Sequence, residues 1–261
     1  MPLYLIGLGL YEEPCLDINT LELLRKSIDE IYIDVYTSPI PYSLEKLSIK
    51  LGKPVYPLRR IDLEDNLYSF IKKAMDKKIA LLVYGDPLIA TTHRNIILAC
   101  IENNIEYGIF HNLSSYQYAI TESGLDIYKF GGTATVMRGG RDTNSRGINL
   151  LKDNLIRGMH TLFLLEYSHE DGYLMHPREA IETIFSDKEI RRKLMDYDGY
   201  IIIMSNLGWR DEFKAAYKID ELDKIYNLEI KGPSILIFTG KLHFMEREYI
   251  EKVLRGGADQ S

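Results

Sequence analysis

The stretch LVYGDPLIATTHRNI, residues 82–96, decides the fold of this chain. An apolar run over residues 79–83 stops at the turn Gly85-Asp86-Pro87, and residues 91–93 open a helix-like segment. A short apolar run between turn signals is typical of a strand that is buried on both faces. Small ligands bind at the carboxyl ends of such strands in open α/β sheets. The turn therefore marks a candidate ligand site.

The composition is that of an ordinary globular protein. The 261 residues are 46% hydrophobic and 27% charged, so the chain can bury a core. A net charge of −6 argues against a nucleic-acid partner. No segment approaches the ~20 apolar residues that span a bilayer, and the start of the chain does not resemble a signal peptide. We expect a cytoplasmic protein that has no membrane contact, with Cys100 as a buried core thiol.

Strand-like and helix-like segments alternate through the first 110 residues, which favours a parallel sheet with helices on both faces. Residues 2–9 and 30–38 are expected strands, and Asp17 stands where it would cap the helix between them. A second helix is expected to end at Gly52. A further expected helix, residues 66–78, precedes the opening strand.

The pattern changes after residue 112, where glycine-punctuated extended segments and helices follow one another. Strands are expected at the end of residues 148–168, in 198–208 and after Gly232, with helices at 177–185 and 187–195. The sequence therefore predicts an α/β protein of two α/β domains, 1–111 with a mostly parallel sheet and 112–261 with a mixed sheet. We expect a ligand cleft between them.

Glycines at the end of the first expected strand invite comparison with a dinucleotide-binding loop. Gly7 and Gly9 fit the fingerprint, but its third glycine would fall at Glu12, which Glu13 follows. Two carboxylates would stand where a pyrophosphate needs helix N–H groups. A ligand without phosphate fits better, and a purely structural turn stays open.

The Gly85-Asp86-Pro87 turn leaves two interpretations open. Asp86 can present its side chain or main chain to a ligand, or it can stabilise its own turn. Thr91 and Thr92 are expected to cap the helix, and His93 is expected to be structural.

The crossover between the two domains contains His111, Asn112, Ser114 and Ser115. These side chains are either the ordinary polar residues of a linker or hydrogen-bond donors to a ligand. No hydrolytic triad motif is present, and the histidines lack the spacing of a zinc site. The sequence thus predicts no metal and identifies no catalytic residue. Glu166 at a strand end is either a candidate base or a buried paired carboxylate.

Several motifs together resemble a known family. They are YLIGLGL (4–10), YTS (36–38), GDPLIATTH (85–93), HNLSS with SGLDIYKFG (111–131), GMHTLFLLE (158–166) and GKLH (240–243). Their order is that of the diphthine synthase family, which belongs to the tetrapyrrole-methylase-like class of S-adenosylmethionine-dependent methyltransferases. The resemblance extends from Leu3 to about Tyr249.

The resemblance implies two α/β domains, a homodimer and S-adenosylmethionine as methyl donor. It implies successive methylation of the amino group on the aminocarboxypropyl-histidine of translation elongation factor 2, in diphthamide biosynthesis. Carried over by position, the cofactor contacts are Leu10, Asp86, Ile89, Ser114, Ser115, Leu165, Leu207 and Ser234. Ser234 stands where relatives have histidine, and RGGRDTNSRGINL (138–150) departs from the family near the substrate side.

Three alternatives remain at this point. A methyltransferase of the same fold could act on a tetrapyrrole or corrinoid precursor, and a substrate test separates the two. A non-catalytic nucleotide-binding module would bind the cofactor without methyl turnover. A nicotinamide dehydrogenase is disfavoured by Glu12 and Glu13.

Overall fold

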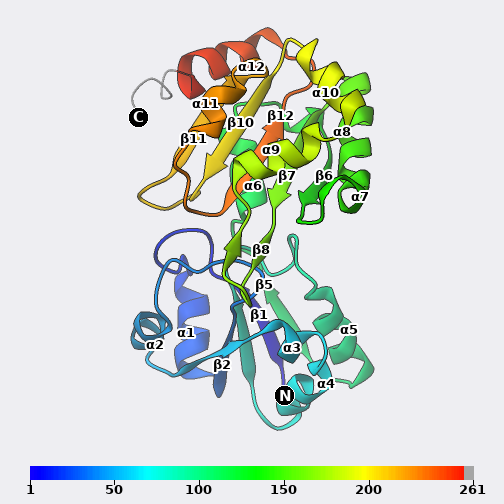
Figure 1. Cartoon of the computed structure of the whole chain (residues 1–261). Helices are drawn as coiled ribbons and strands as arrows, with labels where there is room; N and C mark the ends of the chain where they lie inside the picture. The colour runs from blue at the N-terminus through cyan, green and yellow to red at the C-terminus, as the bar shows by residue number, and fades with distance from the viewer. Residues whose placement is uncertain (256–261) are drawn as a thin grey trace. The chain divides into compact units, whose positions relative to one another are not determined.

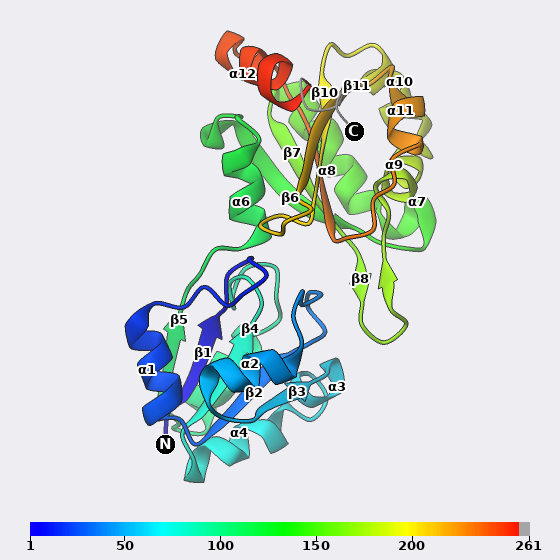
Figure 2. The same ribbon diagram turned by 90° about the vertical axis from the view of Figure 1, so that its left-hand side faces the viewer.

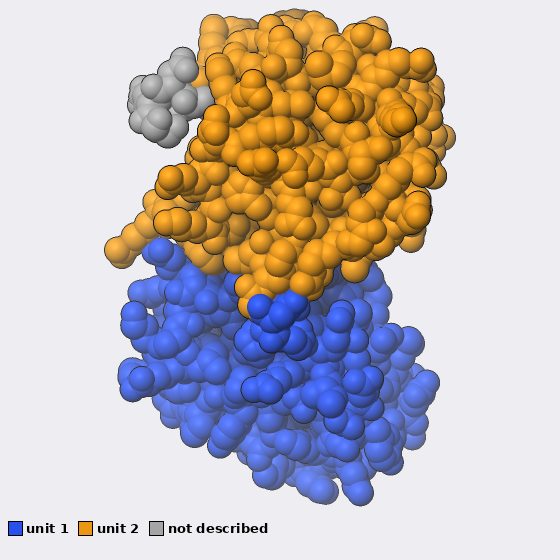
Figure 3. Space-filling view, viewed as in Figure 1, with its two compact units in different colours: residues 1–115, 168–171 blue, residues 116–167, 172–261 orange. Residues whose placement is uncertain are grey.

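The computed structural model describes residues 1–255, which fall into two compact units (Figure 1). Unit 1 contains residues 1–115 and 168–171, and unit 2 contains residues 116–167 and the described residues from 172 onward (Figure 3). The division at 115/116 lies close to the predicted domain boundary at 111/112, which itself stays a prediction. Within residues 1–255, no helix is long and apolar enough to cross a membrane.

Unit 1 is a five-stranded sheet of order β3-β2-β4-β1-β5 in which every neighbouring pair is parallel, as predicted. Its elements are β1 (Leu3–Gly7), α1 (Ile18–Lys26), β2 (Glu30–Asp34), α2 (Leu44–Leu51), β3 (Val55–Leu58), α3 (Arg60–Leu63), α4 (Leu67–Asp76), β4 (Ile79–Val83), α5 (Arg94–Glu102) and β5 (Tyr107–Phe110).

Helices cover both faces of this sheet because the central strands are apolar on both sides. In β4, Ile79, Leu81 and Val83 join the core under α4 and α5. Ala80 and Leu82 face the core under α1 and α2, since side chains alternate along a strand. Figure 1 shows α1 and α2 on one side of the sheet and α4 and α5 on the other.

The helix ends in unit 1 follow the sequence signals. Asp17 caps α1 by accepting from the N–H groups of Asn19 and Thr20 at 2.9 and 3.1 Å. Gly52 ends α2 with a φ of 70°, a conformation that costs other residues more than glycine. Cys100 is fully buried as predicted, and burial raises the pKa of its thiol to about 11.

Unit 2 is a mixed five-stranded sheet of order β11-β10-β12-β7-β6, in which only β6 and β7 pair in parallel; this confirms the prediction. Its elements are α6 (Ser115–Glu122, beginning at the division), η1 (Ile127–Lys129), β6 (Phe130–Val136), α7 (Gly140–Thr143), α8 (Ser145–Arg157), β7 (His160–Leu165), β8 (Tyr167–Ser168), β9 (Tyr173–Leu174), α9 (Pro177–Phe185), α10 (Lys188–Met195), β10 (Tyr200–Ser205), β11 (Phe213–Lys218), α11 (Leu222–Tyr226), β12 (Ser234–Phe238), α12 (Phe244–Tyr249) and η2 (Ile250–Leu254).

The sheet of unit 2 is also sandwiched between helices. Helices α8, α9 and α10 pack on one face around Phe163 and Phe238. Helix α6 and the segment η2 pack on the other face around Ile202 and Ile237. Figure 2 shows the two groups of helices on opposite sides of this sheet.

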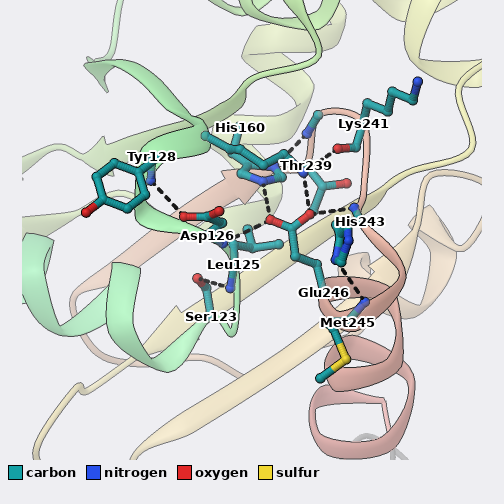
Figure 4. Close-up of polar contacts among 12 residues, drawn as sticks. Ser123, Leu125, Asp126, Tyr128, His160, Thr239, Lys241, His243, Met245 and Glu246 are labelled. Atoms are coloured by element: carbon teal, nitrogen blue, oxygen red, sulfur yellow. Dashed lines mark hydrogen bonds and ion pairs between the residues drawn. The ribbon is translucent and has the colours of Figure 1, made fainter.

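A buried carboxylate, Glu246, accepts hydrogen bonds from four groups at the end of the unit 2 sheet where β7 begins (Figure 4). Its Oε1 accepts from the Asp126 N–H at 2.9 Å and from His160 Nε2 at 3.1 Å. Its Oε2 accepts from the His243 N–H at 2.7 Å and from Lys129 Nζ. The motifs that contain His160 and His243 therefore meet at one carboxylate.

The charges in this cluster are fixed by its surroundings. Burial raises the pKa of Glu246, but the stronger combined effect of the bonds from Lys129, Asp126 and His243 lowers it to about 2. Burial lowers the pKa of His160, and the pull of Glu246 in the other direction is weaker. His160 is thus a neutral imidazole, donating through Nε2 and accepting the Gly240 N–H at Nδ1 over 2.9 Å.

We expect Glu246→Gln to lower the free energy of unfolding by about 3 kcal/mol at pH 7, because it removes one partner from a buried ion pair. Unfolding in urea, followed through the fluorescence of Trp209, the single tryptophan, measures this. Glu248→Gln is the matched control, because Glu248 forms only an exposed pair with Lys252. An equal shift in both variants would contradict the structural role of Glu246.

The same cluster predicts a pH dependence. Both groups have folded-state pKa values below their ordinary values of 6.5 and 4.5, so their contribution to stability is present above those values. The free energy of unfolding should fall below pH 6.5, because His160 binds a proton more readily in the unfolded chain than in the folded one. It should fall further between pH 4.5 and 2, because the same holds for Glu246. Glu246→Gln should show a smaller second decline, because Asp187 and Glu221, whose pKa values are also lowered to about 2, still contribute.

Candidate functional site

The carboxyl ends of β1 and β4 lie beside one another, and the loops that follow them lead in opposite directions across the sheet. The β1 loop leads to β2 on one side, whereas the β4 loop leads to β5 on the other. Such a switch in direction is the preferred ligand position of an open parallel sheet. The structure therefore places the predicted ligand turn at the edge that the sequence indicated.

Two glycines hold these loops together. The Gly85 N–H donates to the Gly9 carbonyl at 2.9 Å, and the Gly9 N–H donates to the Gly85 carbonyl at 3.2 Å. The φ angles are +72° at Gly9 and +83° at Gly85, which explains why glycine stands at both positions. The β1 glycines serve strand packing here and do not form a dinucleotide fingerprint.

The third loop, after β5, is fastened to the first by Asn112. Its Nδ2 donates to the carbonyls of Gly7 and Cys15 at 3.0 and 2.6 Å. The backbones approach so closely that a Cβ on Gly7 would lie 2.6 Å from the Gly85 oxygen and 2.8 Å from the Asn112 Cβ.

Both carboxylate oxygens of Asp86 accept hydrogen bonds from other groups of the protein. The residue is 4% exposed; Oδ1 accepts from the Leu88 N–H at 2.8 Å, and Oδ2 accepts from the Asn112 N–H at 3.1 Å. Oδ2 also accepts from His111 Nδ1 at 2.8 Å. Asp86 thus stabilises its own turn and in addition joins the ends of β4 and β5, so only its main chain remains to meet a ligand.

The rest of the β4 loop is fixed at its far end by His93, which is buried and therefore structural, as expected. His93 Nδ1 lies 3.0 Å from the Pro87 carbonyl, and its Nε2 lies 3.2 Å from Asp34 Oδ2 without the geometry of a hydrogen bond. Between these anchors, Ala90 has a φ of +57°, which is uncommon outside glycine.

The expectation that Thr91 and Thr92 cap the following helix is wrong. Helix α5 begins after His93 and has no side-chain cap. Thr91 Oγ1 donates instead to the Pro87 carbonyl at 2.6 Å, and Thr92 Oγ1 lies 3.0 Å from the Tyr36 hydroxyl. The two threonine hydroxyls therefore form hydrogen bonds within the loop and to a distant residue, and they do not cap the helix.

The five predicted cofactor contacts of unit 1 all stand in these three loops. Leu10 is buried and its carbonyl accepts from the Tyr84 hydroxyl. A Cβ on Gly85 would lie 3.7 Å from the Ser114 Cα and 3.9 Å from Leu10 Cδ2, so Leu10, Asp86 and Ser114 are neighbours. Ile89 is half-buried in the β4 loop, and Ser115 begins α6.

The three predicted contacts of unit 2 also gather at one end of their sheet. Leu165 ends β7, Ser234 begins β12 and Leu207 follows β10. Ser205 pairs with Ser234, and Leu164 pairs with Ile235, so the three positions are close along the sheet edge. The Ser234 hydroxyl donates to the Gly232 carbonyl at 3.0 Å.

Glu166, the candidate base, is a paired carboxylate. Its Oε1 accepts from Arg138 Nε and from one terminal guanidinium nitrogen at 3.0 and 2.9 Å, and its Oε2 accepts from the Arg138 N–H at 2.6 Å. The guanidinium also lies 4.1 Å from the centre of the Tyr173 ring. Both oxygens of the Glu166 carboxylate are therefore engaged by Arg138.

A charged cluster that the sequence did not indicate supports the loop around Leu207. Lys214 Nζ lies 2.6 Å from both Glu122 of α6 and Glu212, and Glu212 accepts from the Gly208 N–H at 2.7 Å. Burial lowers the pKa of Lys214, but the two carboxylates raise it overall, so the lysine stays charged. Within residues 1–255, no group of three or more His, Cys, Asp or Glu side chains could hold a metal ion.

We expect Gly7→Ala to lower the free energy of unfolding of unit 1 by about 3 kcal/mol, because the new methyl meets rigid backbone. Gly52→Ala is the matched control: it has open space, and its positive φ costs about 1 kcal/mol. Hydrogen exchange of the β1 and β4 amides measures both. Equal protection in the two variants would show that the loops are less tightly packed than described.

Comparison with known proteins identifies the family. The family model of the tetrapyrrole (corrin/porphyrin) methylases matches residues 2–223. The diphthine synthases of Methanococcus maripaludis and Archaeoglobus fulgidus are 32% and 31% identical; each match covers 95% of this chain, and 97% and 93% of those proteins respectively. A crystal structure of diphthine synthase superposes with a TM-score of 0.85 at 30% identity, over 98% of this chain and 96% of that one. The chain is therefore a methyltransferase that belongs to the tetrapyrrole methylase family, in which it groups with the diphthine synthases.

Proposed function

We propose that this protein transfers methyl groups from S-adenosylmethionine to the amino group of the aminocarboxypropyl-histidine of translation elongation factor 2. This reaction forms diphthine in diphthamide biosynthesis. The observation that carries the proposal is the similarity to diphthine synthases along almost the whole chain, at about a third identity. Each match covers 95% of this chain, so it includes residues of both units.

The chemistry of the unit 1 edge supports S-adenosylmethionine as the cofactor. This molecule carries an electrophilic methyl group on a sulfonium cation, together with an adenosine, and it has no phosphate. An edge made of a tight turn, a buried carboxylate and small hydroxyls offers main-chain groups and apolar contacts, and the loop after β1 lacks the third glycine of a pyrophosphate-binding fingerprint. No metal is needed, because methyl transfer depends mainly on proximity and orientation.

We assign the cofactor contacts to the eight predicted positions. Asp86 would contribute its main chain, since its carboxylate is fully bonded. Ser114 and Ser115 would offer hydroxyl groups. Leu10, Ile89, Leu165 and Leu207 would supply apolar surface for the adenine. Ser234 would contribute least, because its hydroxyl already donates to Gly232.

The decisive test combines the purified protein, methyl-labelled S-adenosylmethionine and elongation factor 2 that bears the aminocarboxypropyl-histidine. Mass spectrometry should show gains of one methyl at a time on that histidine, and their number gives the extent of methylation. A corrin or porphyrin precursor serves as the competing substrate. Label on the precursor alone would redirect the assignment within the family, and cofactor binding without any turnover would support a binding module.

We expect Ile89→Lys to weaken the binding of S-adenosylmethionine roughly tenfold, since a new cation would face the sulfonium at short range. S-adenosylhomocysteine, which has a neutral sulfur, should be affected much less. Calorimetric titration with both ligands measures the difference. Ile49→Lys is the control, because Ile49 is 74% exposed on α2. The assignment of Ile89 fails if the two ligands are weakened equally.

We further propose that the protein acts in the cytoplasm as a homodimer, with elongation factor 2 as its protein substrate. Both statements rest on the family resemblance. Light scattering should give a mass of twice the 30.2 kDa of one chain. A mass of one chain at micromolar concentration would exclude the dimer.

A further inference from the structure

An exposed imidazole stands at the carboxyl edge of the unit 1 sheet, directly after β5. The His111 side chain is 64% exposed, and its Nδ1 lies 2.8 Å from Oδ2 of Asp86, whose side chain is 3% exposed. An ionised carboxylate only accepts hydrogen bonds, so the proton must be on Nδ1. In the neutral ring the lone pair is therefore on Nε2, and no hydrogen bond to Nε2 occurs within residues 1–255.

The position of this ring relates it to the predicted cofactor contacts. His111 shares Asp86 with the turn that also holds Leu88, and it lies three residues before Ser114. The main chain of its neighbour Asn112 is bonded to the same Asp86 oxygen. The buried carboxylate therefore fixes both the tautomer of the ring and its place at the strand end.

Three other titratable groups near the predicted contacts are already buried or bonded. His93 is 1% exposed. Glu166 is held by Arg138, and Glu212 is held by Lys214 and the Gly208 N–H. His111 alone among these groups combines an accessible position with an unbonded basic atom.

We propose that His111 is the general base of the methyl transfer, with Asp86 as its positioning residue. This inference rests on the proposed function, because it concerns the amino group of that substrate. The N–H bond of the substrate ammonium breaks, the proton goes to Nε2 of His111, and the electron pair stays on the nitrogen. That pair forms the new bond to the methyl carbon, and the carbon–sulfur bond breaks with its electrons on sulfur.

Repeated methylation makes such a base useful. Each transfer to an amine leaves a cationic nitrogen, which must lose a proton before it can attack again. The Asp86 carboxylate lies 2.8 Å from Nδ1 of the ring that receives the proton. Because the ring is exposed, it can release its proton to water before the next transfer. After the third transfer the nitrogen carries no proton, so the base has no further role.

His111→Asn is the sharpest variant, since the asparagine Nδ2 occupies nearly the position of Nδ1. It can keep the hydrogen bond to Asp86 while it removes Nε2. We expect kcat to fall about 100-fold or more, within the usual range for a general base, with the Kd of S-adenosylmethionine within about twofold of the original. His176→Asn is the matched control: His176 caps α9 through Nδ1, and asparagine preserves that cap, so kcat should not change.

Two measurements distinguish a general base from a histidine that only stabilises the structure. Nitrogen-15 NMR of the free protein should show the Nδ1-protonated tautomer for His111, a result that does not depend on turnover. His111→Ala should regain methyl transfer when imidazole is added, in proportion to the concentration of neutral imidazole.

The possible results can be told apart. A wild-type protein that does not methylate elongation factor 2 would overturn the proposed function. A wild-type protein that does, with His111→Asn equally fast, would overturn only the role of His111. An Nε2-protonated ring in the free protein, or a loss of activity in His111→Ala that imidazole does not restore, would also overturn it.

Discussion

The buried carboxylate of Asp86 is the interaction on which the ligand edge of unit 1 depends. A charge in an apolar environment is tolerated only when hydrogen bonds replace the lost water. Asp86 obtains them from its own turn and from two groups at the end of β5. The same bonds therefore satisfy the charge and fix two strand ends relative to one another. Rigid strand ends are what a reaction governed by orientation requires.

Unit 2 uses carboxylates in a similar way, but at both ends of its sheet. Glu246 joins segments where β7 begins, whereas Glu166 and Glu212 hold loops where β7 and β10 end. Each is paired with a lysine or an arginine. These charge pairs hold loops in place. In the proposed reaction, proton transfer is therefore assigned to the imidazole of His111 and not to one of these carboxylates.

The sequence predicted the elements whose signals are local. The apolar run of β4, the cap at Asp17 and the glycine at the end of α2 were all confirmed. Strand β3 was not predicted, because Pro57 interrupts its short pattern. The structure makes β3 an edge strand, where a missing N–H is tolerated.

The contacts of the candidate site were harder to predict for a physical reason. Asp86 lies 25 residues from His111, and Thr92 lies 56 residues from Tyr36. Only the completed sheet brings such partners together, so no local pattern contains them. Local rules favoured helix caps for the threonines and left the role of Asp86 open, whereas the fold decided both.

Residues 168–171 belong to unit 1 although the chain has by then been part of unit 2 for some fifty residues (Figure 3). During synthesis on the ribosome, the first 115 residues emerge early and contain the complete parallel sheet. The last four residues of that unit emerge only after α8 and β7 of unit 2. During synthesis, unit 1 therefore cannot be complete until these elements of unit 2 have been made. A fragment that ends at residue 115 would carry the sheet without its final segment.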